Sequence, residues 1–206
     1  MKKLITISAI ILTLAFVASG QKDDDKNEVS AWGGYSPTST TAFRFAGRVP
    51  NAHFGMFAIR YARRIHDGDS VKIRYTVDAI PASFLSYPDI RVVGPGPSGV
   101  VNVRENRYAW GVSPAGFQFN FRNKKKYQPF VEATGGMLFY HHLVPNFYGT
   151  KLNFTLSIGG GVEIEQGDKS WTVGYKSLHI SNANRGVTNP GFQNNLFYVG
   201  YKFHSW

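Results

Sequence analysis

Residues 71–78 read Val-Lys-Ile-Arg-Tyr-Thr-Val-Asp, and this stretch decides the fold. Apolar side chains alternate with polar or charged ones, and a period of two residues is typical of a β-strand with two unlike faces. Similar alternation recurs at 152–158 and at 197–203. The sequence therefore predicts an all-β protein whose strands present charged groups on one side and apolar groups on the other.

Eight such segments can be identified, and the connections between them are alternately long and short. The strands are expected near residues 28–36, 53–64, 70–80, 107–121, 128–140, 151–165, 171–181 and 194–204. Pro114 and Gly116 interrupt the fourth, which indicates a β-bulge. The longest connection, 81–106, contains a Gly-Pro-rich run and is expected to be an irregular loop. Residues 204–206 are expected to form a short overhang.

Several of these strands have the length of about ten residues that a tilted membrane-spanning strand needs. Charged residues on one face and aromatic or aliphatic residues on the other are typical of a barrel with a polar interior and a lipid-facing exterior. Short turns of such barrels face the periplasm. The sequence predicts an eight-stranded antiparallel transmembrane β-barrel with both termini in the periplasm. Because alternation alone does not distinguish inside from outside, a soluble lipid-binding barrel with apolar side chains inside is an alternative.

The N-terminus predicts export. Lys2 and Lys3 precede an apolar run at 4–18, and small residues follow at 18–20, which is the layout of a cleaved secretory signal peptide. The run is too short to span a bilayer, which needs about 20 residues. The expected organisation is a signal peptide at 1–20, a flexible polar leader at 21–27 and a barrel at 28–206. The expected location is the bacterial outer membrane.

The composition excludes several classes of function. The chain of 206 residues contains no cysteine, which removes disulfides, thiolate metal sites and a lipoprotein anchor. The basic residues behind its net charge of +10 are scattered, apart from Lys124, Lys125 and Lys126, and no nucleic-acid-binding motif is present. No nucleic-acid partner and no metal or organic cofactor are expected. The sequence leaves the oligomeric state open, and a homodimer is compatible with it.

The strand at 171–181 carries the candidate for chemistry. His179 and Ser181 continue its apolar face at the end expected to lie outside. Side chains two residues apart on a strand are neighbours on one surface. A histidine that reaches a serine hydroxyl can act as the general base for a serine nucleophile. Because His-x-Ser also occurs by chance, the pair alone does not identify an enzyme.

The residues around this pair resemble the C-terminal part of the PagL-type lipid A 3-O-deacylases, which are also called acyloxyacyl-hydrolase-like outer-membrane proteins. The resemblance is carried by residues 174–184, by Asn-Pro-Gly at 189–191, by 197–203 and by 128–136 and 154–161. It implies an eight-stranded outer-membrane barrel that hydrolyses the ester at the 3 position of lipid A, so lipopolysaccharide is the expected partner. It also implies that Ser181 is the nucleophile and His179 the general base, and it makes Asn182 a candidate for stabilising the oxyanion.

The sequence departs from this family at the third member of the triad. The family has an acidic residue shortly after His-x-Ser, and by spacing this position is Gln193. No acid follows Asp168, and the acids expected on the outer side are Asp78, Asp89 and Glu105. An amide can orient a histidine through its oxygen but cannot supply charge. Three alternatives follow: a slow deacylase, a deacylase that takes its acid from a loop, or a non-catalytic barrel with an adhesion, resistance or structural role.

Overall fold

The computed structural model describes residues 26–39, 49, 51–94, 99–145, 148–189 and 191–206. The predicted signal peptide at 1–20 and residues 21–25 of the predicted leader lie outside the described residues. Within the described ranges, no helix is long and apolar enough to cross a membrane.

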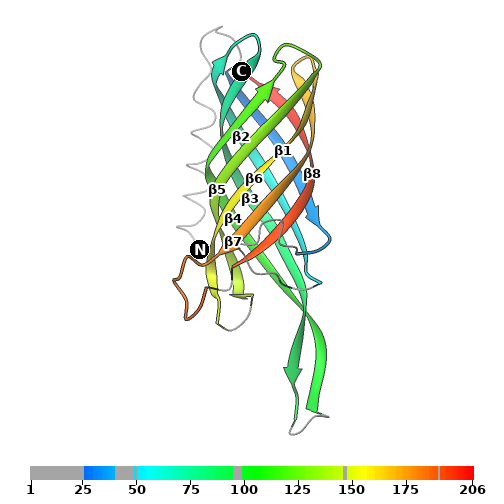
Figure 1. Ribbon diagram of the computed structural model, residues 1–206, viewed down its shortest axis with the longest axis vertical. Coiled ribbons are helices and arrows are strands. Elements are labelled where there is room, and N and C mark those ends of the chain that lie inside the picture. The colour runs from blue at the N-terminus through cyan, green and yellow to red at the C-terminus, as the bar shows by residue number, and fades with distance from the viewer. Residues whose placement is uncertain (1–25, 40–48, 50, 95–98, 146–147, 190) are drawn as a thin grey trace, which may run out of the picture.

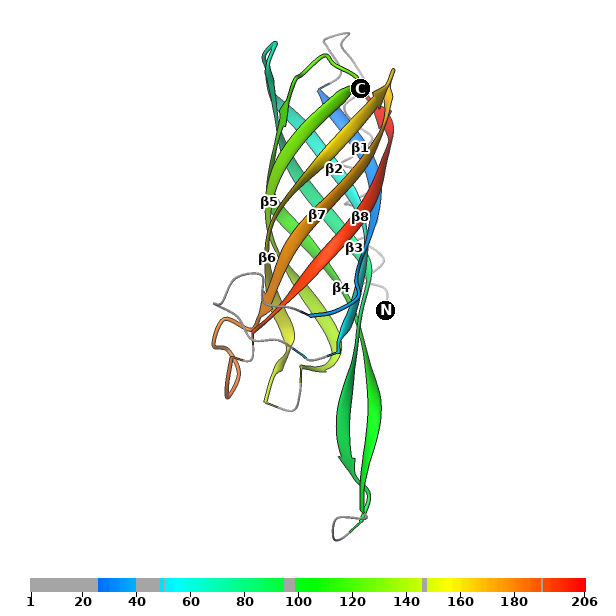
Figure 2. The ribbon, with the colours of Figure 1, turned by 45° about the vertical axis from the view of Figure 1, so that its right-hand side comes forward.

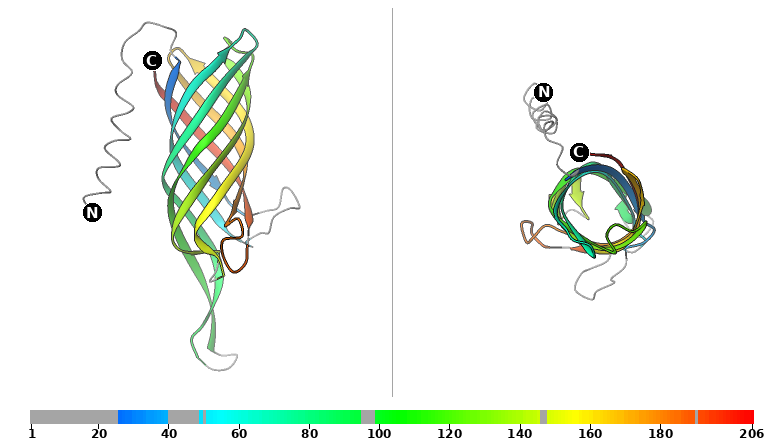
Figure 3. Two further views of the ribbon diagram at one scale, coloured as in Figure 1. Left: turned by 90° about the vertical axis from the view of Figure 1, so that its left-hand side faces the viewer. Right: turned by 90° about the horizontal axis from the view of Figure 1, so that it is seen from above.

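Eight antiparallel strands form a closed barrel, in which β1 pairs with both β2 and β8. The strands are β1 (Asn27–Ser36), β2 (His53–Asp67), β3 (Val71–Val92), β4 (Val100–Phe121), β5 (Tyr127–Val144), β6 (Thr150–Gln166), β7 (Lys169–Ser181) and β8 (Phe192–Ser205). Figure 1 shows their common tilt, and the end-on view in Figure 3 shows the closed ring. Closure leaves no unpaired edge in the wall, which lipid requires. The predicted eight-stranded antiparallel barrel is confirmed.

The charged faces of the strands point into the lumen and the apolar faces point outwards. Arg74 of β3 is 3% exposed, whereas Leu156 and Ile158 of β6 and Phe197 of β8 are all more than 60% exposed, at 64%, 61% and 63%. A basic side chain on the lipid face costs about 2–4 kcal/mol near the middle of the bilayer. This orientation is the one a membrane barrel requires, and it is the inverse of a soluble lipid-binding barrel.

An ion-pair network fills the part of the lumen nearer to the C-terminus. Arg60 contacts Asp78 at 2.7 Å and Glu132 at 2.8 Å, and Lys176 contacts Glu132 at 2.8 Å. Lys176 Nζ also lies 4.2 Å from the ring centroid of Trp32, in a cation–π contact. Because each of these charges has a partner, much of the large cost of removing it from water is offset.

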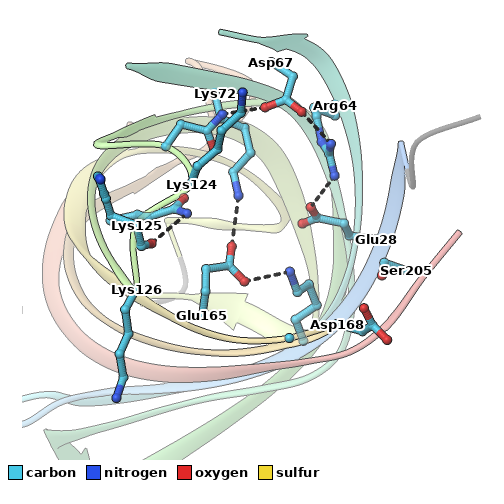
Figure 4. Close-up of a pocket in the computed structure, with 14 residues that line it drawn as sticks. Glu28, Arg64, Asp67, Lys72, Lys124, Lys125, Lys126, Glu165, Asp168 and Ser205 are labelled. Carbon is cyan, nitrogen blue, oxygen red and sulfur yellow. Dashed lines mark hydrogen bonds and ion pairs between the residues drawn. The ribbon is translucent and has the colours of Figure 1, made fainter. Parts of the chain in front are cut away.

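At the same end of the barrel, the lumen opens into a charged cavity of about 350 Å³. Figure 4 shows Lys72 directed at Glu165 and Arg64 placed near Asp67, and their charged atoms are 3.0 Å and 2.7 Å apart. The lysines at 124–126 lie in the short turn between β4 and β5 and line this cavity. Because short turns face the periplasm, this lysine run belongs to the periplasmic mouth.

The outer half of the lumen is mostly apolar, and here the predicted polar interior is wrong. Its fully or almost fully buried inward side chains include Phe54, Leu85, Leu138, Ile180 and Leu196. The interior of an eight-stranded barrel is just wide enough to be filled by side chains, so apolar side chains can pack against one another there. The described residues therefore form a packed core and not an open channel.

The prediction of an irregular loop at 81–106 is also wrong. Beyond a register shift between Ile80 and Ser83, β3 and β4 stay paired as far as Val92 and Val100. Figures 1 and 2 show this pair as a two-stranded ribbon that projects past the rim of the barrel. The predicted bulge in β4 is confirmed by a register shift between Val112 and residue 115.

The C-terminal residues belong to the barrel wall and do not form the predicted overhang. The register between β1 and β8 shifts by one residue between Val29 and Ser30, which leaves Phe203 as a β-bulge. Beyond the bulge, Trp206 exchanges two backbone hydrogen bonds with Asn27, at 2.9 and 3.0 Å. The last strand thus stays paired with β1 beyond the bulge, as far as Trp206.

Candidate active site

His179 and Ser181 lie on the outward face of β7, at the end of the barrel where the longer connections emerge. On the neighbouring strand β6, His179 pairs with Leu156 and Ser181 pairs with Phe154. Leu156 is 64% exposed, which shows that this surface of the wall faces outwards. Both candidate side chains are half-buried. The pair therefore lies at the rim of the lipid-facing surface and outside the lumen.

The two side chains converge on the space next to Gly191. A Cβ atom added to Gly191 would lie 3.0 Å from Cε1 and 3.3 Å from Nε2 of His179, and 3.2 Å from Cβ of Ser181. These distances are shorter than ordinary van der Waals contact, so only glycine lets the backbone at 191 lie against both side chains without displacing them. Within the described residues no hydrogen bond joins His179 to Ser181, and such contacts often form only in the substrate complex. Imidazole and serine thus border the same point of the outer surface, beside the backbone of Gly191.

Asn182 lies on the opposite side of the wall from this pair. Its side chain is 1% exposed, and Nδ2 donates to the carbonyl of Thr188 at 2.7 Å. Its backbone N–H donates to Oδ1 of Asn189 at 3.1 Å. These bonds close the loop between β7 and β8, which brings Gly191 back to His179 and Ser181. The structure therefore gives Asn182 a loop-anchoring position and does not support its predicted contact with an oxyanion.

Gln193 lies directly opposite His179 in the β7–β8 register. Its side chain is 6% exposed, and Nε2 donates a hydrogen bond to Oγ of Ser177, the outward-facing residue that precedes His179 on β7. The backbone carbonyl of Gln193 accepts a hydrogen bond of 2.6 Å from Oγ of Ser39. The predicted third position is thus next to the histidine. The contacts of Gln193 with Ser177 and Ser39 could not be predicted from the sequence, because they depend on the strand register and on the position of Ser39 beyond the end of β1.

The acids that were candidates for a loop-supplied triad member lie elsewhere. Asp78 faces the lumen and is paired with Arg60. Glu105 is paired with Arg107, and Asp89 accepts a hydrogen bond from the backbone N–H of the next residue on the ribbon. In the part of the chain that the structure describes, no hydrogen bond or ion pair joins His179 to an acidic side chain, and no group of three or more metal-ligating residues occurs. Gln193 is therefore the available partner for His179.

A large apolar hollow of about 650 Å³ lies on the same wall, further from the outer rim along β7 and β8. Its lining includes Val173, Phe197 and Val199, and it continues across β1 and β2 to Phe84 of β3. Gly33 and Gly55 face outwards here, and a Cβ atom added to Gly55 would collide with the ring of Phe84, so the missing side chain lets this ring lie against the wall. A glycine inside a strand often marks a place where another group lies close to the backbone. A hollow of this kind can hold hydrocarbon chains against the protein.

Comparison with known proteins agrees with this geometry. The family described as "PagL: Lipid A 3-O-deacylase (PagL)" matches residues 69–202, which include His179, Ser181 and Gln193. The fold is similar to that in the crystal structure of the outer membrane enzyme PagL, with a TM-score of 0.56 and 16% identity over 84% of this chain and 97% of that chain. It is also similar to that of Neisserial surface protein A (NspA), with a TM-score of 0.54 and 14% identity over 85% and 95% of the two chains.

At these identities the structural matches show only a shared fold. No curated protein matches the sequence significantly. The family match is independent of these comparisons and covers more than half of the chain. The chain therefore belongs to the lipid A 3-O-deacylase (PagL) family and is an outer-membrane β-barrel.

Proposed function

We propose that this barrel is a serine-dependent esterase that removes the acyl chain at the 3 position of lipid A. The observation that carries the proposal is that His179 and Ser181 lie together beside Gly191 on the lipid-facing rim. Lipid A lies in the outer leaflet, so its ester groups reach this surface from the membrane without entering the barrel. A site in the lumen would not be accessible to such a substrate.

The proposed reaction follows the acyl-transfer chemistry of serine hydrolases. Ser181 Oγ attacks the ester carbonyl carbon while His179 Nε2 accepts the hydroxyl proton. The tetrahedral intermediate collapses, the bond to the sugar oxygen breaks, and His179 returns the proton to that oxygen. Water then attacks the acyl-serine with His179 again acting as base, which releases the fatty acid and restores Ser181. No cofactor is required for any of these steps.

Gln193 fits the position that orients the histidine. An amide oxygen can accept the proton on Nδ1 and hold the ring in the tautomer that leaves Nε2 free to act as base. It carries no charge, so it stabilises the imidazolium less than a carboxylate does. We therefore propose a slow enzyme in which the third member orients without supplying charge.

The apolar hollow lies in the direction in which the hydrocarbon would run. Phe197 is four residues from Gln193 on β8, and Val173 is six residues from His179 on β7, both away from the rim. A strand rises about 3.3 Å per residue, so the hollow begins roughly 13–20 Å along the strands from the site. This distance is comparable to the length of a fatty acyl chain that descends into the bilayer from an ester at the rim.

A reactive organophosphonate provides the test of the nucleophile. We expect a fluorophosphonate probe to label the protein in detergent micelles, because His179 activates Ser181. Labelling should be lost in Ser181→Ala and strongly reduced in His179→Ala. Mass spectrometry of the labelled peptide gives the modified residue. Equal labelling of the protein and of Ser181→Ala would contradict the assignment of the nucleophile.

Gly191→Ala tests whether the close packing of Gly191 against His179 and Ser181 is needed for activity. The added methyl group would press against His179 and Ser181 at 3.0–3.3 Å, so one of the two side chains would have to move. We expect at least a tenfold loss of ester hydrolysis, because a small misplacement of reacting groups costs as much as about 10²-fold in rate. Gly135→Ala is the matched control, because its new methyl group would meet no atom closer than 3.9 Å. Equal activity of both variants would mean that this close packing is not needed.

The second candidate function is a non-catalytic barrel. Gln193 in the acidic position favours it, and the fold, which is also similar to that of Neisserial surface protein A (NspA), does not by itself imply catalysis. This reading predicts that Ser181→Ala changes neither lipid A nor probe labelling. The two functions are therefore separated by the experiments above.

A further inference from the structure

Ser177 is a buried polar residue on an otherwise lipid-facing surface. It lies two residues before His179 on β7, on the same face, and is 5% exposed. Its Oγ accepts a hydrogen bond from Nε2 of Gln193, which is 6% exposed. A hydroxyl can accept from the NH₂ group of an amide or donate to its oxygen, and here it accepts. Because this hydrogen bond between two buried neutral groups next to lipid has little competition from water, it can hold the amide as it lies.

The strand register places the Gln193 amide between Ser177 and His179. Gln193 is directly opposite His179, and Ser177 is opposite Asn195, so Ser177 lies diagonally across from Gln193. Directly opposed side chains on one face have Cβ atoms about 4.5–5.5 Å apart, and diagonal neighbours about 7–8 Å. A glutamine side chain can therefore reach both residues. Its NH₂ group is engaged by Ser177, which leaves its carbonyl oxygen as the group available to His179.

The two ends of an amide have opposite effects on a catalytic histidine. A carbonyl oxygen facing Nδ1 accepts a proton from it and leaves Nε2 unprotonated, as a general base must be. An NH₂ group facing Nδ1 would instead donate to it, place the proton on Nε2 and remove the base. A carboxylate has two equivalent oxygens and does not present this choice. An amide at position 193 therefore needs a neighbour that keeps its NH₂ group away from His179, whereas a carboxylate does not.

We propose that Ser177 is a positioning residue that holds the Gln193 amide with its NH₂ group turned away from His179. This inference deepens the proposed esterase function and rests on it for its kinetic consequences. Ser177 does not contact the substrate, so it acts on the turnover number through the tautomer of His179. The contribution of Ser177 is tied to the amide and disappears when a carboxylate replaces it.

The kinetic test is a double-mutant cycle between Ser177→Ala and Gln193→Glu. In the Gln193 protein, Ser177→Ala should lower kcat roughly tenfold and leave KM unchanged, which corresponds to the loss of one hydrogen bond. In the Gln193→Glu protein the same change should cost less than about threefold. Ser177→Thr keeps the acceptor oxygen and should retain most of the activity. An equal loss from Ser177→Ala in both backgrounds would overturn the inference and indicate a structural role.

A spectroscopic test is independent of turnover. Nitrogen-15 NMR of labelled histidine in detergent micelles distinguishes a ring protonated at Nδ1 from one protonated at Nε2, and His179→Gln identifies the signal. We expect the Nδ1–H tautomer in the protein and in Ser177→Thr, and a mixture in Ser177→Ala. The same tautomer in all three would overturn the inference even if the proposed function holds. Inactivity of both the protein and Gln193→Glu, with the expected tautomers, would overturn the function but not the positioning role.

Discussion

Replacing Gln193 with glutamate is expected to raise the rate of 3-O-deacylation by up to about 10⁴-fold. Changing the acid of a Ser-His-Asp triad to an amide lowers the rate by about that factor, so the reverse change at position 193 should recover it. The new carboxylate would lie opposite His179 and stabilise the imidazolium that forms as Ser181 attacks. The measurement is the rate of fatty acid release from lipid A by purified protein in detergent micelles.

Asn195→Asp is the matched control for this experiment. Asn195 lies on the same face of β8 but opposite Ser177, so the new charge would not be next to the histidine. We expect no acceleration from Asn195→Asp. Equal rates for the protein and Gln193→Glu, with both folded, would show that position 193 does not act on His179.

The second large effect is expected in the lumen, where Glu132 holds two buried cations. Glu132→Gln keeps the shape of the side chain but removes the charge that Arg60 and Lys176 contact at 2.8 Å. Removing one partner of a buried ionic network costs about 3–5 kcal/mol, because the remaining charge is left without compensation. We expect a loss of this size in the free energy of unfolding, measured by urea titration in detergent micelles.

A second substitution separates the loss of charge balance from the loss of packing. Lys176→Met, added to Glu132→Gln, removes the unpaired cation and should restore a large part of the lost stability. Asp69→Asn is the control at the surface, because its ion pair with Lys124 is exposed and should contribute nothing measurable. A double variant that is less stable than either single variant would contradict this account of the lumen.

The wall of the barrel could be predicted because alternation at period two is a local property of each strand. It gave the outward parity of His179, Ser181 and Gln193, and the register places these three on one surface. The side of the wall that faces lipid was not determined by alternation. The burial of Arg74 and Glu132 among charged partners in the lumen determines it.

The ribbon formed by β3 and β4 could not be predicted, because Pro81, Pro88 and the Gly-Pro run at 94–97 indicate a loop when they are read locally. Proline removes a backbone donor and is excluded from the interior of a sheet. Pro81 lies at the register shift of β3, where the ladder is interrupted. Pro88 lies beyond Ser86, the last residue of β3 that pairs with β2, so one edge of the strand is free there and a missing donor need not cost a hydrogen bond. The pairing of 83–92 with 100–109 is thus compatible with a composition that is typical of loops.

The site could be predicted only as far as its strands extend. The position of Gly191 depends on the loop between β7 and β8, which turns through Ala183 and Asn184 with positive φ angles of 51° and 60°. Asn182 was assigned from its neighbours in sequence, whereas alternation places it on the inner side of the wall. The hydrogen bond between Gln193 and Ser177 needs a register that no sequence pattern specifies.

The central claim is that Ser181 removes an acyl chain from lipid A, and mass spectrometry of lipid A tests it most directly. Cells whose lipid A carries the 3-position ester would express the protein, Ser181→Ala or Gln193→Glu, with each confirmed as folded in the outer membrane. The account predicts the loss of one 3-position acyl chain with the protein, a more complete loss with Gln193→Glu, and no loss with Ser181→Ala. Unchanged lipid A in all three would contradict it and identify a non-catalytic barrel.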